Sequence, residues 1–158
     1  MKEQAFPDPM TALEGFYNGI SCSQAVFGGI APLIGLDRDT ARKISAAFGA
    51  GMRHQGVCGC VTGAMMALGY RYGNIEEVQG SEKQILYDKI AEYEKRFTEI
   101  YGSVICPEML RGYDPSVWED QLEIRKQGLK RTVCAEAVCT ACGLLKEIME
   151  LPENEDEG

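Results

Sequence analysis

The chain has 158 residues, 45% hydrophobic and 25% charged, which is the composition of an ordinary globular protein with room for one core. Its net charge of −8, with basic residues scattered rather than clustered, argues against a nucleic-acid partner, because a phosphate backbone would be repelled. No stretch approaches the roughly 18 apolar residues of a membrane-spanning helix, so membrane insertion is not expected. The first residues also lack a secretory signal, and a cytoplasmic location is predicted.

The first half of the chain predicts four helices. Residues 1–9 contain two prolines and are expected to form an irregular lead-in. Capping boxes open the first two helices, an aspartate at 37 or 39 caps the third, and a glycine-rich loop precedes the fourth. The predicted ranges are 11–18, 21–34, 37 or 39 to 49, and 57–72.

The second half predicts four more helices. Apolar residues recur at spacings of three and four over 81–100, which is the clearest helical pattern of the chain. Ser103 is predicted to cap a helix to residue 110, Pro115 to begin one that ends near 127, and Thr132 to open a last helix to 149. With no alternating strand pattern, the prediction is an all-α, compact, single-domain bundle of five or more helices over 1–158, ending in an acidic disordered tail at 151–158.

Four of the seven cysteines are predicted to lie in the first turns of four different helices: Cys22, Cys58, Cys106 and Cys134. Free amide N–H groups and the positive end of the helix dipole favour thiolate over thiol at such positions. Structural disulfides are rare in the cytoplasm, and an odd number of cysteines cannot all be paired. The cysteines therefore indicate a site of thiol chemistry rather than a disulfide framework.

The same four cysteines carry a resemblance to a known family. They lie in the stretches "GISCSQAV", "CGCVTGAMMALG", "ICPEMLRG" and "CAEAVCTAC", in that order. In order and spacing these stretches resemble the C_GCAxxG_C_C family of redox-active proteins, over nearly the whole chain. The resemblance implies a helical domain with a redox site built from the four cysteines.

Three cysteines and the single histidine depart from this pattern or stand outside it. Cys60 replaces an alanine of the family motif, and Cys139 and Cys142 are additional to it. If the helix is regular there, Cys60 lies about 200° from Cys58, so the two need not face the same site. Cys139 is expected to face water. His54, in the loop before Cys58, is expected to be solvated, although a base beside that thiol is the alternative.

Two functions remain open from the residues. In the first, the four cysteines cycle between thiol and disulfide or transfer electrons with an unidentified redox partner, as in a thiol–disulfide oxidoreductase. Cys58 is then the predicted attacking thiolate, because a flexible glycine loop can bring it to a shared site and the helix dipole favours its thiolate form. In the alternative, Cys22, Cys58, Cys106 and Cys134 bind a metal, either Zn²⁺ or an iron–sulfur cluster.

The glycines before and after Cys58 also have two interpretations. Gly49, Gly51, Gly56 and Gly59 could present backbone N–H groups to an anion. Positive φ angles or a close approach between helices explain the same glycines equally well.

Overall fold

Helices form nearly all the regular structure in the computed structural model, which describes residues 12, 16–75 and 81–152. Its α-helices are α2 (Cys22–Ile30), α3 (Arg38–Ser45), α4 (Gly59–Tyr72), α5 (Ser81–Tyr101), α6 (Cys106–Met109), α7 (Trp118–Lys126) and α8 (Ala135–Ile148). Two 3-10 segments, η1 (Ala31–Ile34) and η2 (Ala50–Arg53), and one π-helical segment, η3 (Lys130–Cys134), complete the helical part. Within the described ranges, extended backbone pairs only at a bridge between Val57 and Ile105.

The predicted all-α bundle of five or more helices is therefore confirmed. The predicted lead-in at 1–9, most of the predicted helix at 11–18 and the predicted tail from residue 153 lie outside the described residues. No helix in the part of the chain that the structure describes is both long and apolar enough to cross a membrane.

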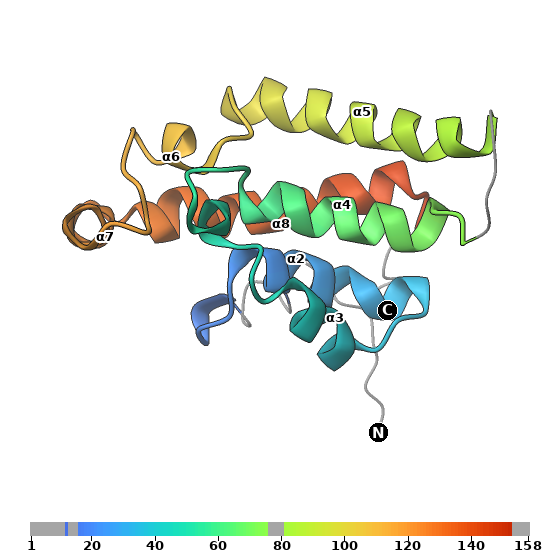
Figure 1. Ribbon diagram of the computed structural model, residues 1–158, viewed down its shortest axis with the longest axis horizontal. Helices are drawn as coiled ribbons and strands as arrows, with labels where there is room; N and C mark the ends of the chain where they lie inside the picture. Colours follow the sequence, from blue (N-terminus) through green and yellow to red (C-terminus); the bar gives the residue numbers. More distant parts are fainter. Residues whose placement is uncertain (1–11, 13–15, 76–80, 153–158) are drawn as a thin grey trace, which may run out of the picture.

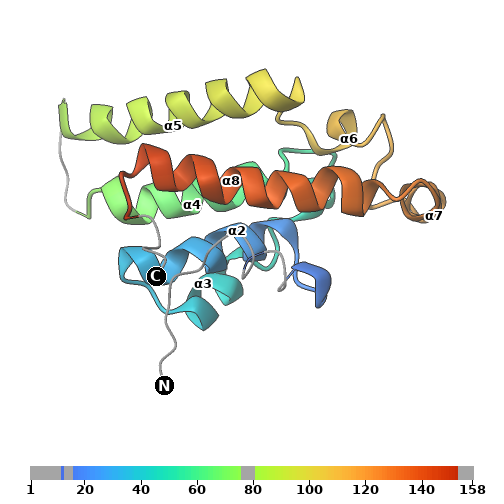
Figure 2. The same ribbon diagram turned by 180° about the vertical axis from the view of Figure 1, so that it is seen from behind.

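The helices are stacked in three layers (Figure 1). Helix α5 forms one outer layer, α4 and α8 form the middle layer, and α2 and α3 form the other outer layer; Figure 2 shows the same order from behind. The core between the layers is apolar, with Val26, Leu68, Phe97 and Leu145 all fully buried. Helices α6 and α7 lie together at one end of the stack, beyond the start of α2 (Figure 1).

Local capping accounts for the starts of α2 and α3, although both helices end earlier than predicted, at Ile30 and Ser45. Ser21 and Gln24 form the predicted capping box at the start of α2, with the Ser21 N–H donating to Gln24 Oε1 over 2.9 Å. Asp37 caps α3 by accepting from the Thr40 N–H at 2.9 Å. The predicted helix at 81–100 is α5, which ends at Tyr101.

The predicted starts of α6 and α7 are wrong. The hydroxyl of Ser103 accepts from the Ile105 N–H at 2.9 Å, which makes a short turn, and α6 begins only after that turn. Pro115 lies in a second turn, closed by the carboxylate of Asp114, and α7 begins after it. In both cases a side chain satisfies the nearby amide outside a helix, so the helix starts later than the sequence indicates.

The predicted start of the last helix is also wrong. The chain is already helical from Lys130, where η3 runs directly into α8. Thr132 caps nothing, because its Oγ1 donates to the carbonyl oxygen of Gly128 at 3.1 Å. Cys134 therefore lies at the end of η3 and not in a first helical turn, so the helix-dipole argument does not apply to it.

Glycines let α4 pack directly on the start of α2. A Cβ atom added at Gly59 would lie 2.8 Å from the Ser23 nitrogen and 2.9 Å from Cys22 Cβ. One added at Gly63 would lie 2.8 Å from the carbonyl oxygen of Ser23. Of the two interpretations of the glycines around Cys58, close approach between helices is thus the one these contacts support. Gly69, on the same helix, has open space around it.

Tyr93 ties α5 to the first turn of α4. Its side chain is fully buried, and its hydroxyl donates to the carbonyl oxygen of Cys60 at 2.7 Å. Burial raises the pKa of Tyr93 well above its ordinary value. The hydroxyl therefore keeps its proton, and with it this hydrogen bond, in the folded protein.

Replacing Tyr93 by phenylalanine is expected to lower the free energy of unfolding by about 0.5–1.5 kcal/mol, because the ring stays packed and one buried hydrogen bond is lost. A folded-state pKa above the unfolded value contributes stability that is complete below about pH 10 and is lost at higher pH. The deficit of the variant should therefore shrink above that pH. Urea unfolding curves at neutral and alkaline pH measure both effects.

The control for this substitution is Tyr101→Phe. The hydroxyl of Tyr101 donates to Thr140 Oγ1 at 2.9 Å in a partly exposed position, so its loss should cost less. A Tyr93→Phe variant as stable as the wild type at neutral pH would show that the hydrogen bond contributes nothing.

Candidate functional site

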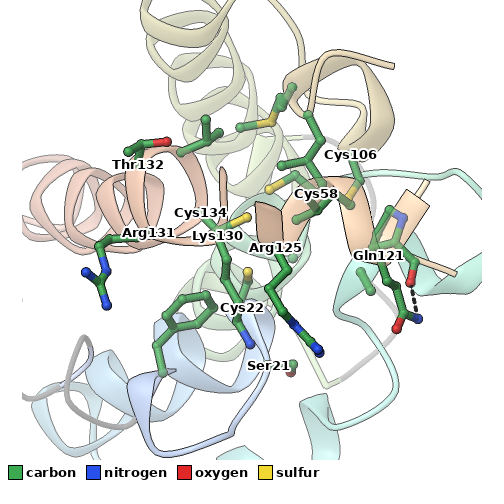
Figure 3. A pocket seen from close by; sticks show the side chains of 18 of the residues that line it. Ser21, Cys22, Cys58, Cys106, Gln121, Arg125, Lys130, Arg131, Thr132 and Cys134 are labelled. Atoms are coloured by element: carbon green, nitrogen blue, oxygen red, sulfur yellow. Dashed lines mark hydrogen bonds between the residues drawn. The ribbon is translucent and has the colours of Figure 1, made fainter. Parts of the chain in front are cut away.

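A pocket of about 870 Å³ opens at the end of the bundle where α2, α4, α6, α7 and η3 meet. Four cysteines line it, one from each of four separate segments of the chain, and they are the four that the sequence singled out: Cys22, Cys58, Cys106 and Cys134. Figure 3 shows them gathered around one space. Each carries a free thiol.

Cys22 is the first residue of α2, directly after the cap Ser21. Hydrogen bonds from the thiols of Cys134 and then Cys60 hold the pKa of Cys22 well below its usual range. Burial opposes this shift, while the charge of Lys130 and the backbone N–H of Cys22 itself add to it. The structure thus favours negative charge on this sulfur.

The two neighbours of Cys22 shift in the opposite direction. The hydrogen bond to Cys22 raises the pKa of Cys134, because the Cys134 thiol loses this contact when it gives up its proton, and burial adds to the effect. The pKa of Cys60 is raised by its hydrogen bonds with Cys22 and Cys58 and by burial. Cys22 therefore carries the negative charge, while Cys60 and Cys134 keep their protons and donate hydrogen bonds to its sulfur.

Cys60 is the site residue that the sequence interpretation missed. It does not line the pocket, but it lies fully buried behind Cys22 and Cys58 and contacts both thiols. The predicted separation from Cys58 assumed that both residues belong to one regular helix. In the structure Cys58 is the N-cap of α4, and its sulfur folds back to accept from the Cys60 N–H at 3.4 Å. A glycine between two cysteines at a helix start is the signal that could have indicated this.

Cys58 and Cys106 are held together by backbone pairing. The Cys58 N–H donates to the Val104 carbonyl at 2.7 Å, and the Cys106 N–H donates to the Gly56 carbonyl at 2.8 Å. These bonds flank the bridge between residues 57 and 105, so the two cysteines lie on the same face of the paired segments. Burial, and next the charges of Cys58 and Cys22, raise the pKa of Cys106 to about 12.

The remaining candidates lie away from the pocket lining. Cys142 is buried on α8, and Cys139 on the same helix is half-buried rather than facing water as predicted. Burial, and next the charge of Glu136, raise the pKa of Cys139. His54 is exposed, in line with the expectation of a solvated side chain.

The alternative prediction is a metal centre held by the same four cysteines. Among residues 12, 16–75 and 81–152, no three His, Cys, Asp or Glu side chains are grouped as a metal site requires. Binding of zinc or an iron–sulfur cluster by the four cysteines stays a prediction.

An all-α bundle whose end carries a pocket lined by free thiols defines the class of this protein as a helical thiol protein. More particularly, residues 20–148 match the model of the family described as "Putative redox-active protein (C_GCAxxG_C_C)", and the chain belongs to that family. The resemblance predicted from the cysteine motifs is thereby confirmed. Comparison with curated proteins and with solved structures gives no match.

Proposed function

We propose that the protein carries out thiol–disulfide exchange, with Cys22 as the attacking thiolate and Cys134 as the resolving thiol. The observation that carries this proposal is the hydrogen-bonded pair of thiols at the pocket wall, in which one pKa is lowered and the other raised. Such a pair provides a nucleophile and an adjacent second thiol, as a dithiol exchange reaction requires. Exchange of this kind fits the predicted cytoplasmic location, where thiols are kept reduced.

The reaction balances with a disulfide as oxidant. The Cys22 thiolate attacks one sulfur of the substrate disulfide, forms a mixed disulfide and releases one substrate thiolate. The sulfur of Cys134 then attacks Cys22, its proton passes to the departing sulfur, and the second substrate thiol leaves. The substrate gains two electrons and becomes two thiols, while the protein dithiol becomes a disulfide that an external thiol reductant can reduce again.

The other cysteines of the site have supporting places in this scheme. Cys60 also contacts the Cys22 thiol, but it does not line the pocket and so is less accessible to a mixed disulfide. Cys58 and Cys106 line the pocket, and we propose them as further thiols of the same redox site. In place of the sequence-based choice of Cys58, the attacking role is assigned to Cys22, because its neighbours donate hydrogen bonds to its sulfur.

Disulfide mapping after mild oxidation tests the proposed pair. One equivalent of dithiodipyridine should lower the thiol titre by two, and a thiol reductant should restore it. Cleavage at Lys, Arg and Glu separates Cys22 from every other cysteine and places Cys134 alone on the fragment 132–136. The expected product is a cross-link between that fragment and the one that contains Cys22.

Serine variants decide the outcome. The cross-link and the loss of two thiols should disappear in Cys22→Ser and in Cys134→Ser, and persist in Cys139→Ser. A cross-link that joins other cysteines in the wild type, or a two-thiol loss that persists in Cys22→Ser, would contradict the assignment.

A further inference from the structure

The lining of the pocket is basic, although the protein as a whole is acidic. The net charge of the chain is −8, yet the described residues of the lining include no aspartate or glutamate. They include three basic side chains: Arg125, Lys130 and Arg131. A concave surface with one sign of charge concentrates ligands of the opposite sign.

Lys130 lies close enough to Cys22 for its charge to act on that sulfur, and Arg125 lines the same pocket. Figure 3 shows the side chains of Arg125 and Lys130 extending past Cys22, with their charged ends on the side where Ser21 lies, whereas Arg131 extends away. The ammonium of Lys130 is further positioned over the ring of Phe16, 5.1 Å from its centroid.

Neither Arg125 nor Lys130 forms an ion pair with a carboxylate within the described residues. Lys126, by contrast, lies on the same helix as Arg125 and has Glu123 at 4.0 Å. The charges of Arg125 and Lys130 are therefore available to a ligand in the pocket.

The size of the pocket suits a small molecule. Sites for small ligands commonly have volumes of about 300–1,000 Å³, and this pocket, at about 870 Å³, falls within that range. Because Cys22, Arg125 and Lys130 line the same pocket, a small molecule bound there while it reacts with Cys22 can present its other groups to both cations.

We propose that the substrate is a low-molecular-weight disulfide that carries carboxylate or other anionic groups, which Arg125 and Lys130 bind while Cys22 attacks its sulfur. This inference rests on the proposed function and adds the class of substrate to it. The exchange is the one already balanced: the small disulfide is reduced to two thiols, and Cys22 and Cys134 are oxidised to a disulfide.

Two reagents of different charge test the inference. Dithiobis(nitrobenzoate) is an anionic disulfide and dithiodipyridine a neutral one, and both release a coloured thiol. The measured ratio is the rate with the anionic reagent divided by the rate with the neutral one. It should fall by about tenfold in a variant that combines Arg125→Gln with Lys130→Gln. The matched control is Lys126→Gln, which removes an exposed charge outside the pocket lining and should leave the ratio within about twofold of the wild type.

The ratio separates binding from reactivity. Loss of Lys130 also changes the thiolate of Cys22, but that change slows both reagents together and cancels in the ratio. High salt should lower the wild-type ratio toward that of the double variant, because it screens charges.

Each result has a distinct meaning. An unchanged ratio in the double variant, with both reactions still dependent on Cys22, overturns the anionic substrate and leaves the proposed function standing; it would favour a protein disulfide as the substrate. Reactions that proceed unchanged in Cys22→Ser overturn the proposed function itself.

Discussion

Replacing Cys22 by serine is expected to remove the fastest-reacting thiol of the protein. At neutral pH an ordinary thiol is only a few per cent thiolate, whereas a thiol of lowered pKa is largely ionised. Part of this gain is offset because a more acidic thiol is a weaker nucleophile, so a rate advantage of about tenfold is expected for Cys22. The measurement is alkylation by iodoacetamide, with the modified peptides identified by mass spectrometry.

The pH dependence of the alkylation rate tests the direction of the pKa shift at Cys22. Because its hydrogen bonds from Cys134 and Cys60 lower its pKa, Cys22 should keep reacting as the pH falls below the ordinary thiol pKa, and slow only near its own. Cys106, whose pKa is raised to about 12, should react slowly throughout this range.

Cys58→Ser is the control, because it removes a different thiol that lines the same pocket. This variant should retain the fast phase of alkylation, which is the phase assigned to Cys22. If the fast phase disappeared in Cys58→Ser and survived in Cys22→Ser, the sequence-based choice of Cys58 as attacking thiolate would be correct.

Substituting alanine for Gly63 is expected to destabilise the protein by about 1–3 kcal/mol, because the added methyl group overpacks a contact with no free space. Its Cβ would lie 2.8 Å from the Ser23 carbonyl oxygen and 3.2 Å from Ser23 Cα, and both are backbone atoms that cannot move aside alone. Since Ser23 follows Cys22, relief of the clash should also displace the attacking thiol. Urea unfolding and the rate of alkylation at Cys22 measure the two effects.

Gly69→Ala is the matched control on the same helix. With open space around Gly69, alanine there should raise the free energy of unfolding by about 0.5–1 kcal/mol, as helix propensity predicts. Equal stability of the two alanine variants would mean that α2 and α4 can separate without cost.

The sequence predicts those features of the fold and site that depend on local interactions. The capping box of α2 and the periodicity of α5 are local, and the start of α2 and the range of α5 follow from them. The thiols of Cys22 and Cys134, however, lie at opposite ends of the chain, and their contact depends on how η3 packs against α2. No local pattern encodes that packing.

Cys60 and Thr132 illustrate two further limits. A helical angle is informative only once the first helical residue is known. Because α4 begins one position after Cys58, the angle of about 200° does not apply, and the Cys58 sulfur accepts from the Cys60 N–H. Thr132 has the type and place of a cap, but the chain before it is already helical, so its hydroxyl bonds to Gly128 instead. Tertiary packing overrides both local patterns.

The distance along the chain between Cys22 and Cys134 has a consequence for the thermodynamics of the oxidised protein. In the unfolded chain the two thiols meet only rarely, whereas the fold holds them in contact and so gives them a high effective concentration. A bridge that closes a loop of about 100 residues removes unfolded-state entropy worth about 4.7 kcal/mol at room temperature. By thermodynamic linkage, the free energy by which the disulfide stabilises the fold equals the free energy by which folding stabilises the disulfide. Oxidation should therefore act as a reversible cross-link that makes the protein harder to unfold whenever its substrate is abundant.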